Sequence, residues 1–335
     1  MRIEGAPARA GPERGWRVLE CRACSFGFTH PRPTPAEIAA LYPPSYGPYQ
    51  RGGISGSEIF NGGTSSFDRL KNRLKGAVLR QRYGYDRLPP PEASHAMPLR
   101  PRPIHRLLVS LVYGYLRYYY PRLPHWRTGG RALDVGCGNG AHLLLLKRLG
   151  WEVAGFDLAD HTVPEVREAG IRVHTGSLEA WASGKDGSFE LITLWHVLEH
   201  VEEPRAVLRS IRRLLAPGGI LMLEVPNRES LPAKIFRQHW IGYDLPRHLS
   251  HFTAKTVSRL LHEAGFTVIR RGTSWKQHLP ASIRRVDEGS GGVRAADPRL
   301  RRLPVRLLLN AVGHLLALTG TGESIHFTAR RTPAE

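Results

Sequence analysis

Short apolar runs alternate with helix-spaced apolar patterns through the middle of the chain. Each run is short enough for a buried strand, and apolar residues recur at helical spacing in the segment that follows it. The runs predict strands at residues 131–135, 152–156, 172–174, 191–194 and 220–225. The segments that follow predict helices at residues 141–149, 164–169, 178–182 and 204–215. Alternation of this kind is typical of parallel strands joined by crossover helices, and therefore of the α/β class.

The C-terminal part is predicted to add one helix and two strands. The helix ends at Gly265, a residue type favoured just after helices. The expected elements are a helix at 254–264 and strands at 266–270 and 324–329. Three segments interrupt the pattern: a turn at Pro217–Gly219, an insertion at 234–252, and an extra stretch at 272–322 with an apolar helix near 302–318.

The N-terminal third does not follow the α/β alternation. Its patterns predict a β-hairpin at 16–33, helices at 34–41, 66–83 and 103–120, and a Pro-rich linker at 88–102. We therefore divide the chain into a disordered tail at 1–15, a hairpin and lid segment at 16–66, a helical extension at 67–128 and an α/β domain at 129–335 that contains the 272–322 insertion.

Composition adds expectations about partners and compartment. The formal net charge is +19, which favours an anionic partner such as nucleic acid, membrane head groups or a phosphorylated substrate, unless it reflects compositional drift alone. Three cysteines make no disulfide framework. Residues 1–15 contain no apolar core of a signal peptide, and no run approaches the roughly 18–20 apolar residues of a membrane span. We expect a cytoplasmic protein, with peripheral contact to the inner membrane face as an option.

A glycine-rich turn follows the first strand of the alternating region. It runs from Asp134 through Gly136, Gly138 and Gly140. Three glycines in five residues let the backbone turn sharply and approach a ligand, and the helix that follows points its first N–H groups at that ligand. The next strand ends just before Asp157, about twenty residues past the glycines, where a carboxylate accepts ribose hydroxyls. Together these features predict a nucleotide-type cofactor at the strand ends.

Three segments, in this order and spacing, resemble the class I S-adenosylmethionine (SAM)-dependent methyltransferases. They are the Asp-Val-Gly-Cys-Gly-Asn-Gly turn, the segment His196–His200, which has the sequence His-Val-Leu-Glu-His, and the Leu-x-Pro-Gly-Gly-x-Leu segment at 215–221. The resemblance covers residues 131–330. It implies a doubly wound, Rossmann-like, seven-stranded sheet whose last strand is antiparallel, with SAM as methyl donor and S-adenosylhomocysteine as product.

The resemblance also implies which residues contact SAM. Asp134 and the backbone of the turn would hold the amino-acid end, Asp157 the ribose, and Leu158 would flank the adenine. Ser177 stands where the family often has an aspartate, so a backbone carbonyl or Glu179 would supply that adenine contact. The expected contacts are Asp134, Gly136, Cys137, Gly138, Asn139, Gly140, Asp157, Leu158, Ser177, Leu178 and His196.

His196, Glu199 and His200 follow the predicted strand at 191–194, at the end where ligands bind in such sheets. Zinc peptidases with a similar spacing place it inside a longer helix, so we reject that interpretation. The segment resembles the Glu-x-x-Glu-His of ubiquinone-pathway O-methyltransferases and RNA 3′-terminal 2′-O-methyltransferases, which hold a divalent metal with it and a later histidine. Here His196 replaces the first glutamate, and His248 or His251 would be the fourth ligand. Two imidazoles and a carboxylate suit zinc or another transition metal.

Two interpretations of this cluster stay open. In the one we adopt, no metal binds, Glu199 and His200 cap the helix and bond to backbone, and His196 contacts only the cofactor. Without a metal, a neutral imidazole at His200 or His251 can still remove the acceptor's proton, with His196 and Glu199 orienting the acceptor. In the other interpretation the same side chains hold a metal. The candidate catalytic residues are His196, Glu199, His200, His248 and His251, and we expect at least one of the last two to face the pocket.

Cys21 and Cys24 form a Cys-x-x-Cys turn in the predicted hairpin. This turn resembles half of a zinc ribbon that precedes the catalytic domain in some bacterial methyltransferases. Those relatives carry an earlier Cys-x-x-Cys that is missing here, and structural zinc normally takes four ligands. His30 is the one nearby third candidate. We expect the hairpin to pack without a metal.

The sequence thus predicts a SAM-dependent methyltransferase that methylates an oxygen of a glycan, a sugar or a lipid-linked metabolite. Relatives with a degenerate hairpin and a Pro-Arg-His-x-x-His-Phe segment, here at 246–252, often act on such substrates. The apolar, Arg-edged helices at 103–120 and 302–318 either pack over the sheet or lie at an interface where they touch lipid or a lipid-linked substrate. Two alternatives remain: an RNA 2′-O-methyltransferase and a SAM-binding regulatory protein without catalysis. The oligomeric state and the attacked atom stay open.

Overall fold

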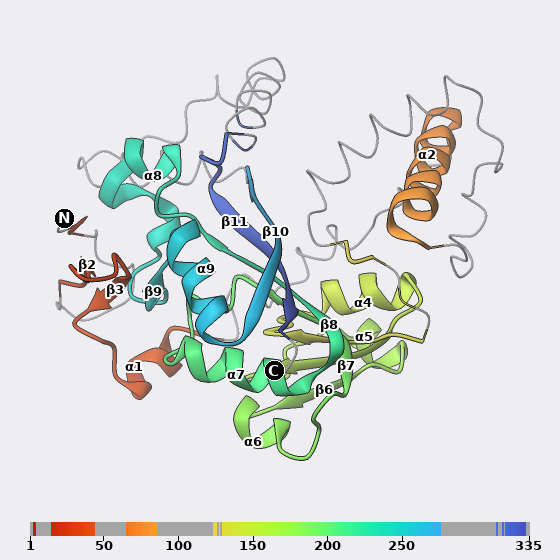
Figure 1. Ribbon diagram of the computed structural model, residues 1–335, viewed down its shortest axis with the longest axis horizontal. Helices are drawn as coiled ribbons and strands as arrows, with labels where there is room; N and C mark the ends of the chain where they lie inside the picture. Colours follow the sequence, from red (N-terminus) through yellow and green to blue (C-terminus); the bar gives the residue numbers. More distant parts are fainter. Residues whose placement is uncertain are drawn as a thin grey trace. The chain divides into compact units, whose positions relative to one another are not determined.

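The computed structural model describes residues 3–4, 15–43, 65–85, 123–125, 127, 129–275, 313, 317 and 319–332. The chain divides into two compact units. The first comprises residues 1–43, 195–212 and 223–335, and the second comprises residues 44–194 and 213–222. Figure 1 gives the positions of the labelled elements along the chain.

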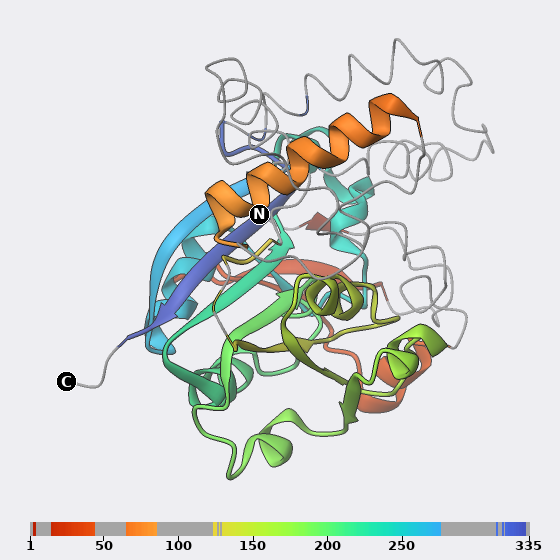
Figure 2. The same cartoon turned by 90° about the vertical axis from the view of Figure 1, so that its right-hand side faces the viewer.

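A seven-stranded sheet has the order β10-β11-β8-β7-β4-β5-β6, which confirms the predicted α/β fold. β4 pairs in parallel with β5 and with β7, and β5 pairs in parallel with β6. The last strand, β11, pairs antiparallel with β10, and Figure 2 shows these two strands side by side. The strands are β4 (Arg131–Val135), β5 (Glu152–Asp157), β6 (Arg172–Thr175), β7 (Phe189–Trp195), β8 (Leu215–Pro226), β10 (Phe266–Ser274) and β11 (Ser324–Arg331).

The central strands β4 and β7 are buried along nearly their whole length, as parallel strands covered on both faces must be. This explains why their sequences are continuous apolar runs rather than alternating ones. The five helices predicted at 141–149, 164–169, 178–182, 204–215 and 254–264 all form. They are α4 (Ala141–Arg148), α5 (Pro164–Glu168), α6 (Leu178–Ala182), α7 (Pro204–Leu214) and α9 (Ala254–Glu263).

The turn predicted at Pro217–Gly219 is wrong, because these residues lie inside β8. A Cβ atom on Gly219 would lie 3.1 Å from the carbonyl oxygen of Phe189 in β7. The lack of a side chain therefore lets this backbone come close to its neighbour. Here the Pro-Gly-Gly sequence allows β8 to lie close to β7 and does not form a separate turn.

The basic helix predicted at 66–83 is confirmed as α2 (Ser66–Tyr83). Tyr85, just after the helix, is fully buried, and its hydroxyl accepts a 3.0 Å hydrogen bond from Trp151 Nε1. The same hydroxyl donates to the carbonyl oxygen of Pro124 at 3.0 Å. These bonds satisfy the buried phenol and connect the end of α2 to Pro124 and Trp151 of the same unit.

The N-terminal hairpin forms as predicted, with β2 (Arg17–Glu20) antiparallel to β3 (Gly27–His30). The helix after it is α1 (Pro35–Ala40), whose N-cap Thr34 makes a reciprocal capping box with Glu37. The sequence did not predict that β3 also pairs with β9 (Ser250–His251), in a four-stranded sheet of order β1-β2-β3-β9 that begins at β1 (Ile3–Glu4). The hairpin and the insertion that carries β9 belong to the same compact unit.

The insertion predicted at 234–252 contains short helices as well as β9. These are α8 (Leu231–Phe236), η4 (Arg237–His239) and η5 (Ile241–Tyr243). Trp240, Tyr243 and Leu245 form an apolar cluster with Trp16 and Val18 of the hairpin region. Burial of these aromatic and aliphatic side chains together fixes the hairpin on the insertion.

Several predictions fall outside the described residues. They are the disordered tail over most of 1–15, the lid over most of 42–66, the linker at 88–102, the helix at 103–120, and the 272–322 insertion with its helix near 302–318, of which only a few positions are described. Among the described helices, none is both long and apolar enough to cross a membrane.

Candidate active site

The glycine turn between β4 and α4 lies in the second unit and has the predicted form. Gly140 is the N-cap of α4 at φ 84°, and its missing Cβ would lie 2.4 Å from Val166 Cγ2. A larger residue would therefore be strained and would also clash. Gly140 makes no side-chain cap bond, and the first turn of α4 holds no acidic residue. The helix N-terminus is therefore suited to an anionic ligand group.

Asp157, the last residue of β5, is hydrogen-bonded to this turn. Its Oδ2 accepts a hydrogen bond from the Gly138 N–H, and its Oδ1 accepts one from the Leu158 N–H, both at 2.7 Å. Burial raises the pKa of Asp157, although these two hydrogen bonds act to lower it. The Leu158 side chain is 70% exposed, although leucine is usually buried. A carboxylate beside an exposed leucine fits the ribose and adenine of SAM.

The other expected SAM contacts have internal roles as well. Asp134 is buried and accepts a hydrogen bond from the Thr193 hydroxyl. Asn139 Oδ1 accepts from the Ala141 N–H at 3.1 Å, and Ser177 is the N-cap of α6. Cys137 and Leu178 are buried. The described residues of the turn thus fit the amino-acid end of SAM through backbone and carboxylate groups, with the remaining positions shaping the turn.

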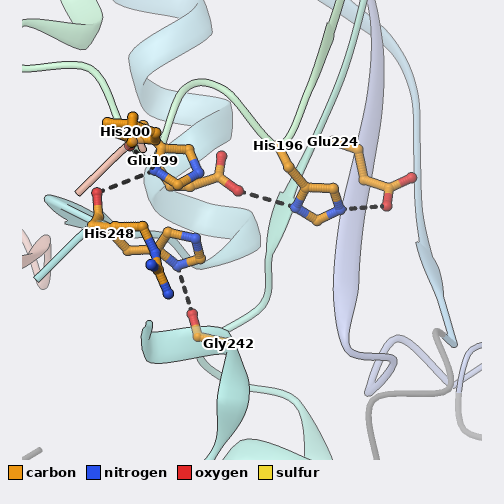
Figure 3. Close-up of polar contacts among 8 residues, drawn as sticks. His196, Glu199, His200, Glu224, Gly242 and His248 are labelled. Atoms are coloured by element: carbon orange, nitrogen blue, oxygen red, sulfur yellow. Dashed lines mark hydrogen bonds and ion pairs between the residues drawn. The ribbon is translucent and has the colours of Figure 1, made fainter. Parts of the chain in front are cut away.

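His196 lies between two buried carboxylates, as Figure 3 shows. Its Nδ1 is 3.0 Å from Glu199 Oε1, and its Nε2 is 3.1 Å from Glu224 Oε1. Its backbone has φ 57°, in the left-handed region that costs energy for a residue with a Cβ. The His196 N–H also donates to the Glu224 carbonyl oxygen at 2.9 Å. Backbone and ring together hold His196 between the two carboxylates.

Glu199, His200 and His248 form a second group, in which one potential ligand atom of each lies within 4.8 Å of the others. The Nδ1 of His200 is 2.8 Å from the Tyr42 hydroxyl and 3.1 Å from the Arg247 carbonyl oxygen. The Nδ1 of His248 is 2.8 Å from the Gly242 carbonyl oxygen.

A carbonyl oxygen can only accept, so each Nδ1 carries the proton and each Nε2 keeps its lone pair in the neutral ring. Metal-binding histidines typically have this arrangement. The Oε2 of Glu199 is buried and has no hydrogen-bond partner among the described residues. The group therefore presents two ring nitrogens and one carboxylate oxygen, a donor set that fits a transition metal.

The charges in this group follow from burial and close neighbours. Burial and the nearby His248 lower the pKa of His200 to about 4, so its ring is neutral at pH 7. Burial alone would raise the pKa of Glu199, but the hydrogen bond and the electrostatic interaction with His196 lower it overall. A neutral imidazole beside an ionised carboxylate can bind a metal or accept a proton.

The structure separates the five predicted catalytic residues. Among the described residues it brings Glu199, His200 and His248 together as potential ligands, and His251 lies outside this group. His196 is also outside the group but contacts Glu199 and Glu224, so the expectation that it contacts only the cofactor is wrong. His251 is buried, and its Nε2 lies 2.9 Å from the Thr29 hydroxyl. Glu199 and His200 do not cap a helix as expected, because residues 198–200 form a turn.

The sequence interpretation missed Glu224. This side chain is fully buried in β8 and contacts His196. One signal was present: Glu224 is a charged residue inside the otherwise apolar run Ile220–Val225. A buried charge in such a run needs a hydrogen-bond or ion-pair partner, so the sequence already marks Glu224 as a candidate site residue.

In the hairpin, Cys21 and Cys24 are both reduced and partly exposed. Hydrogen bonds from the backbone N–H groups of Cys24 and Ala23 lower the pKa of the Cys21 thiol. Among the described residues, no third histidine, cysteine or carboxylate gathers with this pair as a ligand group does. A lowered pKa favours the thiolate, so we expect Cys21 to react readily with alkylating agents.

The different environments of Cys21 and Cys137 predict the order in which these cysteines are alkylated. Iodoacetamide at neutral pH should modify Cys21 at least about tenfold faster than Cys137, because burial raises the pKa of the Cys137 thiol and shields it. Peptide mapping by mass spectrometry over time measures both rates. Urea should remove the difference by exposing Cys137. Equal rates in the folded protein would contradict the burial of Cys137.

Comparison with known proteins agrees with this geometry. Residues 112–271 match a family model described as "Methyltransferase domain". Residues 112–271 thus form a methyltransferase domain, and the seven-stranded sheet, the glycine turn and Asp157 are features expected of a domain that uses SAM as its cofactor.

The chain is also similar to curated proteins. One is the ubiquinone biosynthesis O-methyltransferase of Xanthomonas oryzae pv. oryzae, 37% identical over 133 residues, which are 37% of this chain and 56% of that protein. Another, from Xanthomonas euvesicatoria pv. vesicatoria, is 36% identical over 133 residues with the same coverage. This chain thus spans just over half the length of these relatives. A SAM-dependent methyltransferase structure from Archaeoglobus fulgidus aligns at 20% identity with a TM-score of 0.44, covering 66% of this chain and 93% of that one.

Proposed function

We propose that the protein is a SAM-dependent O-methyltransferase whose acceptor hydroxyl is activated at Glu199, His200 and His248. The observation that carries the proposal is the arrangement of this group. Both histidines direct their Nδ1 atoms at backbone carbonyl oxygens, and Glu199 keeps a buried oxygen without a hydrogen-bond partner among the described residues. A buried group of this kind is costly unless a ligand uses it.

Chain connectivity supports the proposal. β4 and β7 are parallel neighbours, with Val135 opposite Leu194. The glycine turn directly follows β4, and His196 directly follows β7. Ligands bind at the carboxyl ends of strands in open α/β sheets.

The transfer is an in-line displacement in which the acceptor oxygen attacks the methyl carbon of SAM. A C–O bond forms as the C–S bond breaks, and S-adenosylhomocysteine leaves. The sulfonium already activates the methyl group, so the protein must position the acceptor and remove its proton. Without a metal, the neutral Nε2 of His200 takes that proton, while His196 and Glu224 hold Glu199 in place. A divalent metal held by Glu199, His200 and His248 would supply positive charge that favours the deprotonated acceptor oxygen.

The acceptor class we propose is a small hydroxyl compound: a glycan, a sugar or a lipid-linked metabolite. The similarity to proteins named ubiquinone biosynthesis O-methyltransferases supports methylation of oxygen. The net charge of +19 favours an anionic or membrane-associated acceptor.

Incubation with labelled SAM and fractionated extracts tests the proposal. Label should enter the lipid or glycan fraction in an alkali-stable, ether-linked form. Entry into RNA alone would replace the acceptor class by a nucleic acid. Binding of SAM without transfer to any fraction would favour a regulatory protein and contradict the proposed catalysis.

A further inference from the structure

The strand β3 of the N-terminal hairpin is joined directly to the segment that carries His248 and His251. Gly27 pairs with His251, and Phe28 pairs with Ser250, in antiparallel register. One residue further along β3, the Thr29 N–H donates to the Leu249 carbonyl oxygen at 3.0 Å. The hairpin therefore continues as a sheet with the insertion.

The Thr29 side chain makes two further contacts with this segment. Its hydroxyl donates to the His248 carbonyl oxygen. A hydroxyl has one hydrogen, so the second contact, 2.9 Å from His251 Nε2, is a bond that the histidine donates. Thr29, His248 and His251 are all buried, so each of these polar groups depends on a protein partner.

The opposite side of the same segment is bonded to the backbone of Glu199. The Glu199 carbonyl oxygen accepts hydrogen bonds from the Leu249 N–H at 2.7 Å and from the Ser250 N–H at 3.0 Å. The segment that begins at His248 thus lies between Thr29 and Glu199. Its position sets the His248 ring relative to the Glu199 carboxylate.

Close packing and an ion pair hold the hairpin in this position. A Cβ on Gly27 would lie 2.9 Å from the His251 carbonyl oxygen, so a side chain there would push the strands apart. Arg228 donates to Glu20 at 2.8 Å and to the Ser25 carbonyl oxygen at 3.0 Å. The hairpin has little freedom to move without displacing the histidine segment.

We propose that Thr29 is a positioning residue of the active site and that the hairpin orders the histidine segment, so that His248 lies in place beside Glu199 and His200. This inference rests on the proposed function of that group. It gives the hairpin a role in positioning active-site residues, a role that the Cys-x-x-Cys turn alone did not indicate. Thr29 acts through the backbone of His248 and through the ring of His251.

The test uses the full chain with Thr29→Val, Thr29→Ala and Thr29→Ser, and Thr267→Val as the control. Thr267 is an exposed residue of β10 whose hydroxyl meets only Thr332 among the hydrogen bonds described. Affinity for Zn²⁺ alone should fall about 10- to 100-fold in the two variants without the hydroxyl, as when groups that orient a ligand are lost. Thr29→Ser and Thr267→Val should stay near wild type, and SAM affinity should be unchanged in all four.

Nitrogen-15 spectra of the histidine rings separate this inference from the proposed function. In the wild type, His251 should carry its proton on Nε2, and Thr29→Val should change the His248 and His251 signals while Thr29→Ser preserves them. If wild type binds no Zn²⁺, the metal version of the function fails, and these signals still decide the role of Thr29. Unchanged signals and unchanged Zn²⁺ affinity in Thr29→Val would overturn it. So would failure of both hydroxyl-free variants to fold beside a folded Thr29→Ser, which would make Thr29 a stability residue.

Discussion

Replacing Glu199 with glutamine should lower methyl transfer about a hundredfold or more while SAM affinity stays at the wild-type value. The change removes the charge of a fully buried carboxylate that contacts His196 and gathers with His200 and His248. Proton removal from the acceptor and metal binding both depend on that group, and positioned acid–base groups contribute about this much to a rate. Steady-state turnover and titration calorimetry with SAM measure the two quantities separately.

Glu202→Gln is the matched control, because Glu202 is an exposed glutamate three residues further along the chain. Metal analysis of the purified protein separates the two versions of the mechanism. Stoichiometric zinc that is lost in Glu199→Gln supports a metal site, whereas an active enzyme free of metal supports proton removal by His200. Intact turnover after alanine replaces His196, His200, His248 and His251 would defeat both versions and leave catalysis to positioning alone.

Replacing Asp157 with alanine should weaken SAM binding by about 1.5–3 kcal/mol, the usual effect of losing hydrogen bonds to a charged group. The Asp157 carboxylate is nearly buried, accepts the Gly138 N–H at 2.7 Å, and so connects β5 to the glycine turn. Its loss removes the acceptor for the ribose hydroxyls and loosens the turn. Titration calorimetry measures the affinity.

Asp186→Ala serves as the control for this change. Asp186 belongs to the same unit, is exposed, and makes a surface ion pair with Arg213 at 3.1 Å, which contributes little to stability. SAM should bind this variant as it binds the wild type. An Asp157→Ala protein with unchanged SAM affinity, or a wild type that binds no SAM, would contradict the assignment of the turn.

Local sequence patterns predicted most of the strands and helices of the fold. The apolar runs at 131–135 and 191–194 predicted β4 and β7 because parallel strands buried on both faces need continuous apolar sequence. Thr34, Gly140 and Gly265 marked helix ends through their own hydrogen bonds or backbone freedom. Prediction failed at Pro217–Gly219, where the same residue types that form turns allow β8 to approach β7.

The residues expected to bind the cofactor could also be predicted from the sequence. The glycine turn and Asp157 contact each other across the ends of two adjacent strands, so their spacing along the chain already implies their meeting. The histidine side was different. The sequence left His248 and His251 equivalent, since both lie in one insertion and both are histidines.

By itself, the sequence determined the α/β alternation, the SAM-type turn and the presence of His196, Glu199 and His200 after β7. Only the tertiary structure decided that His248 joins Glu199 and His200 and that Glu224 holds His196. It likewise decided that His251 bonds to Thr29, from which it is separated by more than two hundred residues. The physical reason is that periodicity and capping act between residues a few positions apart. The partners of a buried polar group are chosen by whichever distant strand packs beside it.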